Sequence, residues 1–254
     1  MKNVVVVLTL LMPMLALGQS TDSIKFKRYK VGILYSPDYC YRILSYHSSN
    51  KWVEDLRNNE EVSTYGYTAG LGIKIDLTRK IIMETGLLYS IMGEQTQNSN
   101  LVWATPNPEL PVKSKTRYQF KYIQVPLKAN YLLGGRKVKI FASAGVSVNV
   151  FSEKKTKVIS QFANGHKSSE SSVVDLGYLK FNVAAMAGFG IRYDLTKRVC
   201  ISVEPVYRQF INSIVVDKKA KEYPYSIGAN VAVYYSFKKK NRAAANVGKQ
   251  QIIK

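Results

Sequence analysis

The stretch Tyr122–Val150 reads YIQVPLKANYLLGGRKVKIFASAGVSVNV and decides the predicted fold. Apolar side chains alternate with polar or small ones on both sides of Gly134-Gly135. The apolar positions are Ile123, Val125, Leu127, Ala129, Tyr131 and Leu133, then Val138, Ile140, Ala142, Ala144, Val146 and Val148. A period of two on either side of a Gly-Gly turn indicates a β-hairpin. Each arm has the ~9–11 residues that a tilted strand needs to cross a bilayer, so we predict one quarter of a membrane barrel.

The rest of the chain repeats this alternation. It predicts six further strands, at about residues 29–37, 65–77, 80–93, 178–195, 198–210 and 225–237. We expect long loops at 38–63, 94–116 and 152–177, a shorter one at 213–224, and tight turns elsewhere. Alternating long and short connections with an even strand count are typical of outer-membrane barrels. The predicted fold class is therefore all-β, an eight-stranded antiparallel up-and-down transmembrane β-barrel over residues 29–237.

Two segments echo each other and support this topology. Gly70–Lys80 reads GLGIKIDLTRK, and Gly188–Arg198 reads GFGIRYDLTKR. A repeated strand, turn and strand is expected of an up-and-down barrel. In the hydrocarbon core of a membrane, every backbone N–H and C=O must be hydrogen-bonded within the protein. A sheet can meet this requirement only by closing into a barrel. The alternative is a soluble lipocalin-like barrel, whose apolar side chains would face inward.

The two ends of the chain have their own patterns. Residues 1–18 combine a positive start, an apolar run and Ala16-Leu17-Gly18, which together predict a secretory signal peptide. Residues 19–28 are then a periplasmic segment, and residues 238–254 a basic periplasmic tail that we predict to be disordered. The formal net charge of +20 would suit nucleic acid, but an exported protein does not meet it, so we expect no nucleic-acid partner.

The last predicted strand resembles a known assembly signal. Residues 230–237, NVAVYYSF, are similar to the C-terminal signal read by the barrel-assembly machinery, with Asn230, Tyr235 and Phe237 at its key positions. Ala232 replaces the usual Gly, and seventeen residues follow Phe237 where that pattern usually ends the chain. The resemblance implies that the barrel-assembly machinery is a partner during biogenesis.

A second resemblance concerns the family. Tyr122–Tyr131 fits the pattern Y-x-x-x-P-L-x-x-x-Y and resembles a strand of the PorT-like outer-membrane barrels of Bacteroidetes. Residues 35–38, YSPD, and 86–90, GLLYS, are similar to that group too. The resemblance covers about residues 29–237 and implies an eight-stranded barrel. It does not imply one task, since the group is broad; its namesake assists a protein secretion system.

Two sets of charged residues are candidate sites. The predicted inward side chains Lys74, Glu84, Lys128, Arg192, Glu204 and Arg208 would form a charge network that fills the lumen, since buried charges must pair. The alternative is a functional conduit. At the predicted periplasmic end, a basic rim would favour anionic lipid, the alternative being simple solubility of short turns. Its members are Arg79, Lys80, Arg136, Lys137, Lys197, Arg198, Lys238, Lys239 and Lys240.

The sequence predicts no enzyme and no cofactor or metal site. Only His47 and His166 are present, both in predicted loops, and His166 with its neighbouring serines and Glu170 offers residue types without geometry. Cys40 and Cys200 are placed at opposite ends of the barrel, beyond the ~7 Å between bridged Cα atoms, so no disulfide is expected.

We therefore expect a non-enzymatic integral protein of the outer membrane that anchors or binds through long external loops. Its partners would be outer-membrane lipids and the barrel-assembly machinery. One alternative is an accessory component of a protein secretion or gliding apparatus, which would add secretion-system proteins as partners. A second is an outer-membrane lipid-modifying enzyme.

Overall fold

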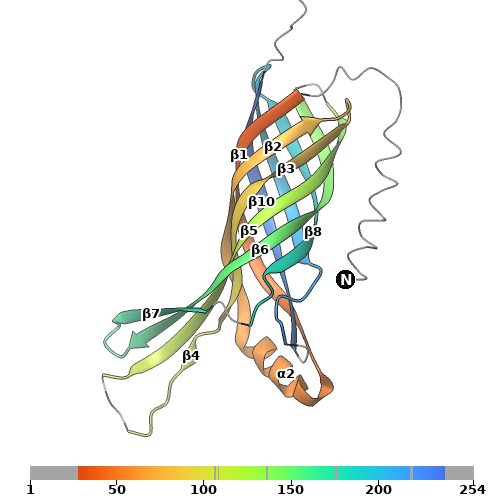
Figure 1. Ribbon diagram of the computed structural model, residues 1–254. Coiled ribbons are helices and arrows are strands. Elements are labelled where there is room, and N and C mark those ends of the chain that lie inside the picture. Colours follow the sequence, from red (N-terminus) through yellow and green to blue (C-terminus); the bar gives the residue numbers. More distant parts are fainter. Residues whose placement is uncertain are drawn as a thin grey trace, which may run out of the picture.

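A computed structural model describes residues 28–105, 107, 109–135, 137–174, 177–217 and 220–237. The predicted signal peptide, residues 19–27, Arg136 and the basic tail lie outside these residues. The chain forms one antiparallel sheet that closes through the pairing of β5 with β6, and Figure 1 shows the resulting barrel. The predicted fold class, an all-β ring of eight strands, is confirmed.

The elements follow one another along the chain with bounds that differ from the predicted ones. They are β1 (Arg28–Tyr46), η1 (Ser48–Asn50), α2 (Lys51–Glu60), β2 (Glu61–Asp76), β3 (Ile81–Thr96), β4 (Ser99–Asn100), β5 (Pro111–Gly134), β6 (Val138–Phe162), β7 (Lys167–Val174), β8 (Phe181–Asp194), β9 (Val199–Phe210) and β10 (Ala220–Ser236). The sheet order is β4-β5-β3-β2-β1-β10-β9-β8-β6-β7. No helix among the described residues is long and apolar enough to cross a membrane.

The register of the ring fixes the stagger of its strands. Register partners lead from Val31 through Ile73, Thr85, Leu127, Val146, Ala185, Gln209 and Tyr225 back to β1 at Tyr41. The path returns from residue 31 to residue 41, so the shear is ten residues. Closed barrels of this kind tilt their strands by roughly 35–45°, and eight strands leave an interior that side chains can fill.

The two faces of the wall are as the alternation predicts. On the hairpin, Ile123, Val125 and Leu127 are exposed on the outside, whereas Gln124 and Lys128 are buried inside. Exposed aromatic rings gather near both ends of the wall, as in membrane barrels. They are Tyr39, Tyr65, Tyr67 and Tyr207 on the side of the long connections, and Tyr29, Tyr131, Tyr193, Tyr235 and Phe237 by the short turns. We call the end with the long connections the mouth.

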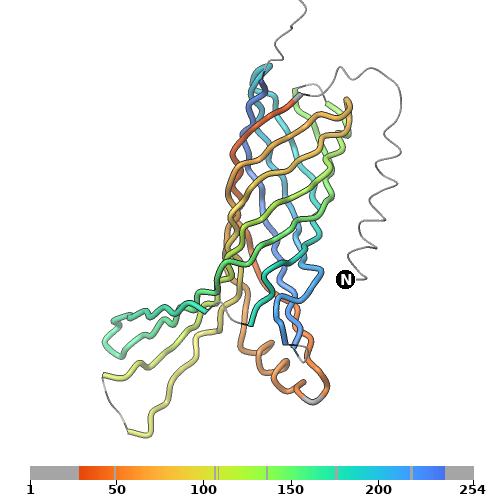
Figure 2. The backbone as a smooth tube through the Cα atoms, in the orientation of Figure 1, coloured from red at the N-terminus to blue at the C-terminus, as the bar shows by residue number. Residues whose placement is uncertain are grey.

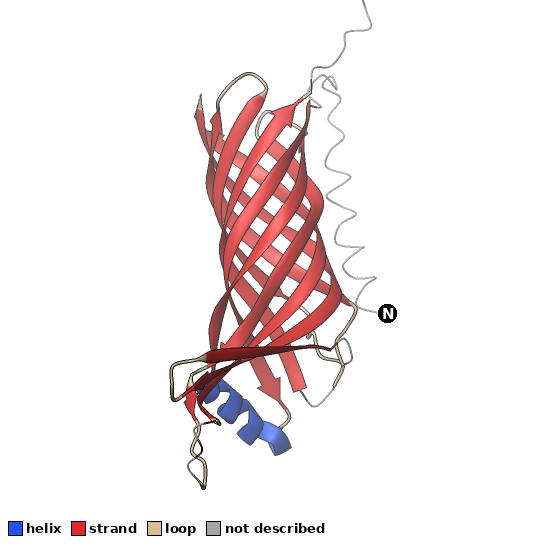
Figure 3. Ribbon diagram, turned by 90° about the vertical axis from the view of Figure 1, so that its left-hand side faces the viewer, coloured by secondary structure: helices blue, strands red, loops and turns tan. Residues whose placement is uncertain are grey.

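The predicted long loops are only partly loops, because several of their segments continue the strands of the ring. β1 runs to Tyr46 rather than ending at Pro37, and β5 and β6 stay paired from Pro111 to Phe162. We call the part beyond the wall the blade: β4, Pro111–Lys121, Glu153–Phe162 and β7. Figure 2 shows the blade leaving the barrel to one side, and Figure 3 shows α2 beside it. The strands of the blade were not predicted because most of their side chains are polar on both faces, with no apolar lipid-facing side.

The interior of the barrel contains two buried apolar clusters. The first, which we call the apolar layer, comprises Cys40, Met92, Phe120, Tyr122, Phe151, Ala184, Phe210 and Ile214. These residues come from six of the eight ring strands and from the connection after β9, so the layer draws on most of the ring. The second cluster comprises Leu34, Leu88, Cys200, Ala232 and Tyr234. The core of this protein therefore fills its lumen.

Candidate functional site

A chain of ion pairs runs through the lumen beside the second apolar cluster, whose Tyr234 ring lies 4.3 Å from Lys74 Nζ. Lys74 Nζ lies 3.3 Å from Glu84 Oε2, and Lys128 Nζ lies 3.5 Å from Glu84 Oε1. Lys128 also contacts Glu204 Oε2 at 2.6 Å. All four side chains are buried, so each depends on the others for compensation of its charge. Tyr234 adds a hydroxyl at 3.2 Å from Glu84.

The chain continues toward the mouth through an amide and a guanidinium. Asn230 Nδ2 donates to Glu204 at 3.0 Å, and Arg208 donates to Asn230 Oδ1 at 2.5 Å. Arg208 then pairs with Asp38 at 2.7 Å, and Asp38 accepts a hydrogen bond from Thr68 at 2.6 Å. We call this series the ionic ladder; its members are Lys74, Glu84, Lys128, Glu204, Asn230, Arg208 and Asp38. The structure thus brings together five of the six charged residues predicted for the lumen.

Arg192, the sixth predicted lumen residue, belongs to another group. Its guanidinium pairs with Asp194 at 2.8 Å, and Lys139 contacts the same carboxylate at 2.8 Å. Nearby, Lys30 pairs with Asp76 at 2.6 Å. These pairs lie at the end of the barrel with the short turns, below the ladder, so the lumen is closed by ion pairs there as well.

Asp38 is the ladder residue that the sequence analysis missed. Pro37 was interpreted as the end of the first strand, which left Asp38 in a loop. In the structure β1 continues, and Ser36, Asp38 and Arg42 are all buried. The sequence does contain a pattern that indicates this longer strand. The even-numbered polar residues alternate with Tyr35, Tyr39 and Ile43, which are exposed on the lipid-facing side.

At the mouth, two arginines face three glutamates. Arg57, near the end of α2, donates to Glu61 at 3.0 Å and to Glu222 at 3.2 Å, and lies 3.7 Å from Glu94. Arg42 donates to Glu61 at 3.0 Å. The helix is positioned by these contacts, since it has no buried residue of its own. All five residues fall in the predicted loops 38–63, 94–116 and 213–224, and none is among the predicted site residues.

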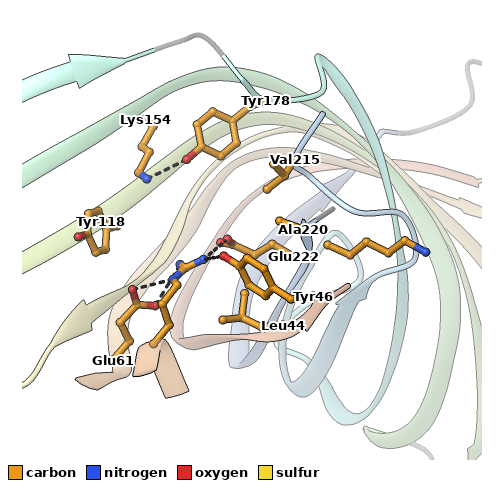
Figure 4. Close-up of a pocket in the computed structure, with 11 residues that line it drawn as sticks. Leu44, Tyr46, Glu61, Tyr118, Lys154, Tyr178, Val215, Ala220 and Glu222 are labelled. Atoms are coloured by element: carbon orange, nitrogen blue, oxygen red, sulfur yellow. Dashed lines mark hydrogen bonds and ion pairs between the residues drawn. The ribbon is translucent and has the colours of Figure 1, made fainter. Parts of the chain in front are cut away.

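A cavity of about 250 Å³ opens above the apolar layer at the mouth. In Figure 4, Glu61 and Glu222 line one part of it, and Lys154 and Tyr178 line another. Lys154 Nζ donates to the Tyr178 hydroxyl at 2.8 Å and lies 4.5 Å from the centre of the Tyr118 ring. Carboxylates, ammonium and aromatic faces in one hollow can hold the polar groups of a small ligand.

Glu94 has the most unusual electrostatic environment at the mouth, beyond the aromatic rings that mark the edge of the wall. Burial raises the pKa of this carboxyl well above its usual range, and the charges of Glu222 and Glu61 raise it further. Arg42 and Arg57 oppose the shift. Oε1 of Glu94 and Oε1 of Glu222 are buried, and neither forms a hydrogen bond with another described residue. Within the described ranges, no three His, Cys, Asp or Glu side chains are arranged to hold a metal ion.

The structure also places the other predicted residues. Asn230 faces the lumen as part of the ladder, whereas Tyr235 and Phe237 face outward with ring centres 5.4 Å apart. The rim residues Arg79, Lys80, Lys137, Lys197 and Arg198 lie at the short turns; Arg136 and Lys238–Lys240 lie outside the described residues. The assembly signal and the lipid-binding rim stay predictions.

The cysteines and histidines occupy separate places. Cys40 lies in the apolar layer, not in a loop, and Cys200 lies in the other cluster; both are free thiols. His166 lies in the turn at the tip of the blade, where its ring is 5.9 Å from the ring of Phe162. Among the described residues, no hydrogen bond joins its side chain to a serine or a carboxylate.

A closed ring with an apolar outer wall, two aromatic belts and a filled polar interior defines a membrane-embedded β-barrel. The chain belongs to the family described as outer membrane protein beta-barrel domain, whose model matches residues 30–214. Membership places the protein among the integral proteins of the outer membrane.

The chain is similar to several solved structures at low identity. Neisserial surface protein A is 13% identical, with 81% of this chain and 96% of that chain covered and a TM-score of 0.41. Ail of Yersinia pestis is 14% identical, with 83% and 99% covered and a TM-score of 0.32. The outer membrane protease OmpT of Escherichia coli is 10% identical, with 86% and 100% covered and a TM-score of 0.42. No curated protein matches the sequence.

Proposed function

We propose that this protein is a non-enzymatic outer-membrane barrel that anchors or binds through its mouth and blade, which face outside the cell. The observation that supports this is the filled lumen. The ionic ladder and the apolar layer occupy the interior, while the strands continue outside the wall as a hydrogen-bonded sheet. A packed interior is a poor conduit, whereas side chains held on strands make a precise binding surface.

The proposed orientation follows from the connections. The turns at residues 77–80 and 195–198 are short, and all helical structure in the described residues lies at the opposite end. Barrels of the outer membrane have short periplasmic turns and long external connections. Both termini, the predicted signal-peptide cleavage and the basic rim then belong to the periplasmic side.

A second candidate is an accessory role in protein secretion, in keeping with the resemblance to PorT-like barrels of Bacteroidetes. The basic residues Arg79, Lys80, Lys197 and Arg198 at neighbouring short turns favour it, because they could meet an acidic partner in the periplasm. A lipid-modifying enzyme has less support, since the Ser, His and carboxylate of the blade tip form no hydrogen-bonded set among the described residues.

Protease treatment of intact cells tests the proposed orientation. Proteinase K should cut at Leu101–Thr105 or in the turn Ala163–His166, which lie outside the strands. It should spare Lys154–Phe162, which is paired on both sides by β5 and β7, although the sequence analysis had expected a loop there. Cuts confined to 77–80 and 195–198 would place the mouth in the periplasm and contradict the proposal.

A further inference from the structure

The charged side chains on one face of the blade are basic, with one exception. Cross-strand partners share a face of a sheet, and residues two apart along a strand lie on the same face. By this rule the cations on one face are Lys113, Lys115, Arg117, Lys121, Lys155, Lys157 and Lys167. The acid on that face is Glu153, and it is already paired with Lys121. The face therefore carries a large uncompensated positive charge.

The opposite face of the same sheet is nearly neutral. It presents Ser114, Thr116, Thr156, Val158, Ser160, Ser168, Glu170 and Ser172. Its one lysine, Lys154, turns toward the aromatic rings of the mouth. Two strongly different faces on one thin sheet indicate a specific surface, because a general need for solubility would not sort the charges by face.

Repulsion between the basic side chains destabilises the blade when nothing is bound to it. Arg117 lies directly opposite Lys157 in the register, and Lys155 and Lys157 are neighbours on the same strand face. Like charges directly across a strand pair repel and destabilise it. A bound anionic surface removes this repulsion, which gives the arrangement a physical reason.

The position of this face favours a membrane as its partner. Lys121 shares its side of β5 with Ile123 and Val125, so the basic face continues the lipid-facing wall. A bulge between Lys121 and Tyr122 shifts the register where the blade begins, and bulges bend a sheet. Figure 1 shows the blade leaning away from the barrel axis. A wall that bends outward turns its outer side toward the membrane surface.

We propose that the basic face of the blade docks on anionic, phosphate-bearing headgroups of the lipid leaflet around the mouth. Lysine and arginine near an anionic membrane surface are each attracted to it, and the attraction decays within a Debye length. This inference rests on the proposed function for the idea that the mouth end is the binding end, and it names anionic, phosphate-bearing lipid as the partner.

The test uses the full chain in nanodiscs and a fluorophore on either face of the blade. Ser171→Cys places the label on the basic face, beside Lys157, and Ser172→Cys places it on the other face, beside Thr156. The native thiols are buried and should not react. With a quencher on the lipid headgroups, the label at position 171 should be quenched at least about twofold more than the label at 172 when phosphatidylglycerol is present.

Two further sets of measurements decide whether charge causes the difference in quenching between the two labels. The excess quenching should disappear in phosphatidylcholine alone, in about 1 M salt, and in the double variant Lys115→Gln/Lys157→Gln. The matched variant Lys51→Gln/Lys180→Gln, which loses two exposed cations outside the blade, should keep it. Equal quenching of the two labels in phosphatidylglycerol discs would overturn the proposal. Shielding of position 171 by dextran sulfate without any lipid quenching would also overturn it, in favour of a soluble polyanion. Nanodiscs have no inside or outside, so this result is independent of the orientation test in cells.

Discussion

Val146 and Ser147 are neighbours in β6 whose side chains lie on opposite sides of the barrel wall. Val146 is 38% exposed on the wall, whereas Ser147 is 1% exposed and accepts a hydrogen bond from Gln124 at 2.9 Å. An Arg on the lipid-facing side should cost roughly 2–4 kcal/mol. Val146→Arg should therefore lower the yield of heat-modifiable, folded barrel more than Ser147→Arg, as measured by gel mobility and urea unfolding in lipid vesicles.

The narrow lumen adds a volume cost to any long side chain at position 147, so a shorter pair serves as the control. Val146→Asp and Ser147→Asp change charge with less volume. If both variants at 147 fold worse than their partners at 146, the apolar side faces inward, and the barrel is the soluble lipocalin-like alternative.

The stability of the folded protein should depend on pH through Glu94. Because its pKa is raised in the folded protein, protonation of Glu94 contributes stability at low pH that is lost as the pH rises through the raised value. Glu94→Gln keeps the neutral shape at every pH. The variant should therefore have a higher urea midpoint than the wild type at neutral pH, and the advantage should vanish in acid.

Glu61→Gln is the matched change within the same cluster. Glu61 accepts hydrogen bonds from the charged side chains of Arg42 and Arg57. Loss of the Glu61 charge should therefore destabilise the protein by roughly 1.5–3 kcal/mol at neutral pH. If Glu94→Gln lowers the urea midpoint as Glu61→Gln does, Glu94 is ionised in the folded state and our assignment of its environment is wrong.

At the residue scale, the alternation predicted the faces well where one parity was apolar. It placed Lys128 and Glu204 inside and Ile123 and Val125 outside, as observed. It could not find Arg57 or Glu222, because their partners are set by how α2 and β10 meet at the mouth, and the sequence spacing of 165 residues carries no trace of that contact.

At the scale of elements, the blade and the barrel should be separable. The apolar layer includes one blade residue, Phe120, but neither the layer nor the ladder involves β4, residues 111–115, residues 157–162 or β7. Replacing residues 98–115 and 158–170 with short hairpin turns should therefore leave a folded, heat-modifiable barrel with a urea midpoint close to that of the wild type.

Removal of α2 provides the contrasting change. Replacing residues 51–60 with a flexible linker removes Arg57 from Glu61, Glu94 and Glu222, and buried carboxylates without partners are costly. This variant should be clearly less stable than the blade truncation. A blade truncation that fails to fold would show that the outer sheet is needed by the ring.

The same elements show why the strand ends were hard to predict. Residues 152–162 carry mostly polar side chains on both faces, and the bulge after Phe151 changes which parity faces outward. Their strand pairing comes from the neighbouring β5 and β7, not from a lipid-facing pattern. By contrast, the turns after Asp76 and Asp194 were predicted correctly, because the apolar alternation stops there and resumes at once.

For the whole molecule, the way in which the ring closes determines how much interior its side chains must fill. A shear of ten residues in an eight-stranded ring leaves a narrow interior, and the ladder and the apolar layer occupy it. In the proposed function, the wall serves as an anchor in lipid and the mouth and blade bind. The sequence predicted the ring, but not the layer, since Tyr122, Phe151 and Phe210 meet only when the ring closes.

Conductance in planar lipid bilayers tests whether the lumen of the barrel is blocked. The wild-type protein should insert and give no channel steps at either polarity, because the apolar layer and the ladder block the lumen. As a positive control, the variant Tyr122→Ala/Phe151→Ala/Phe210→Ala, with the layer removed, should leak more than the wild type. Stable conductance steps from the wild-type barrel would contradict the account and make the protein a conduit.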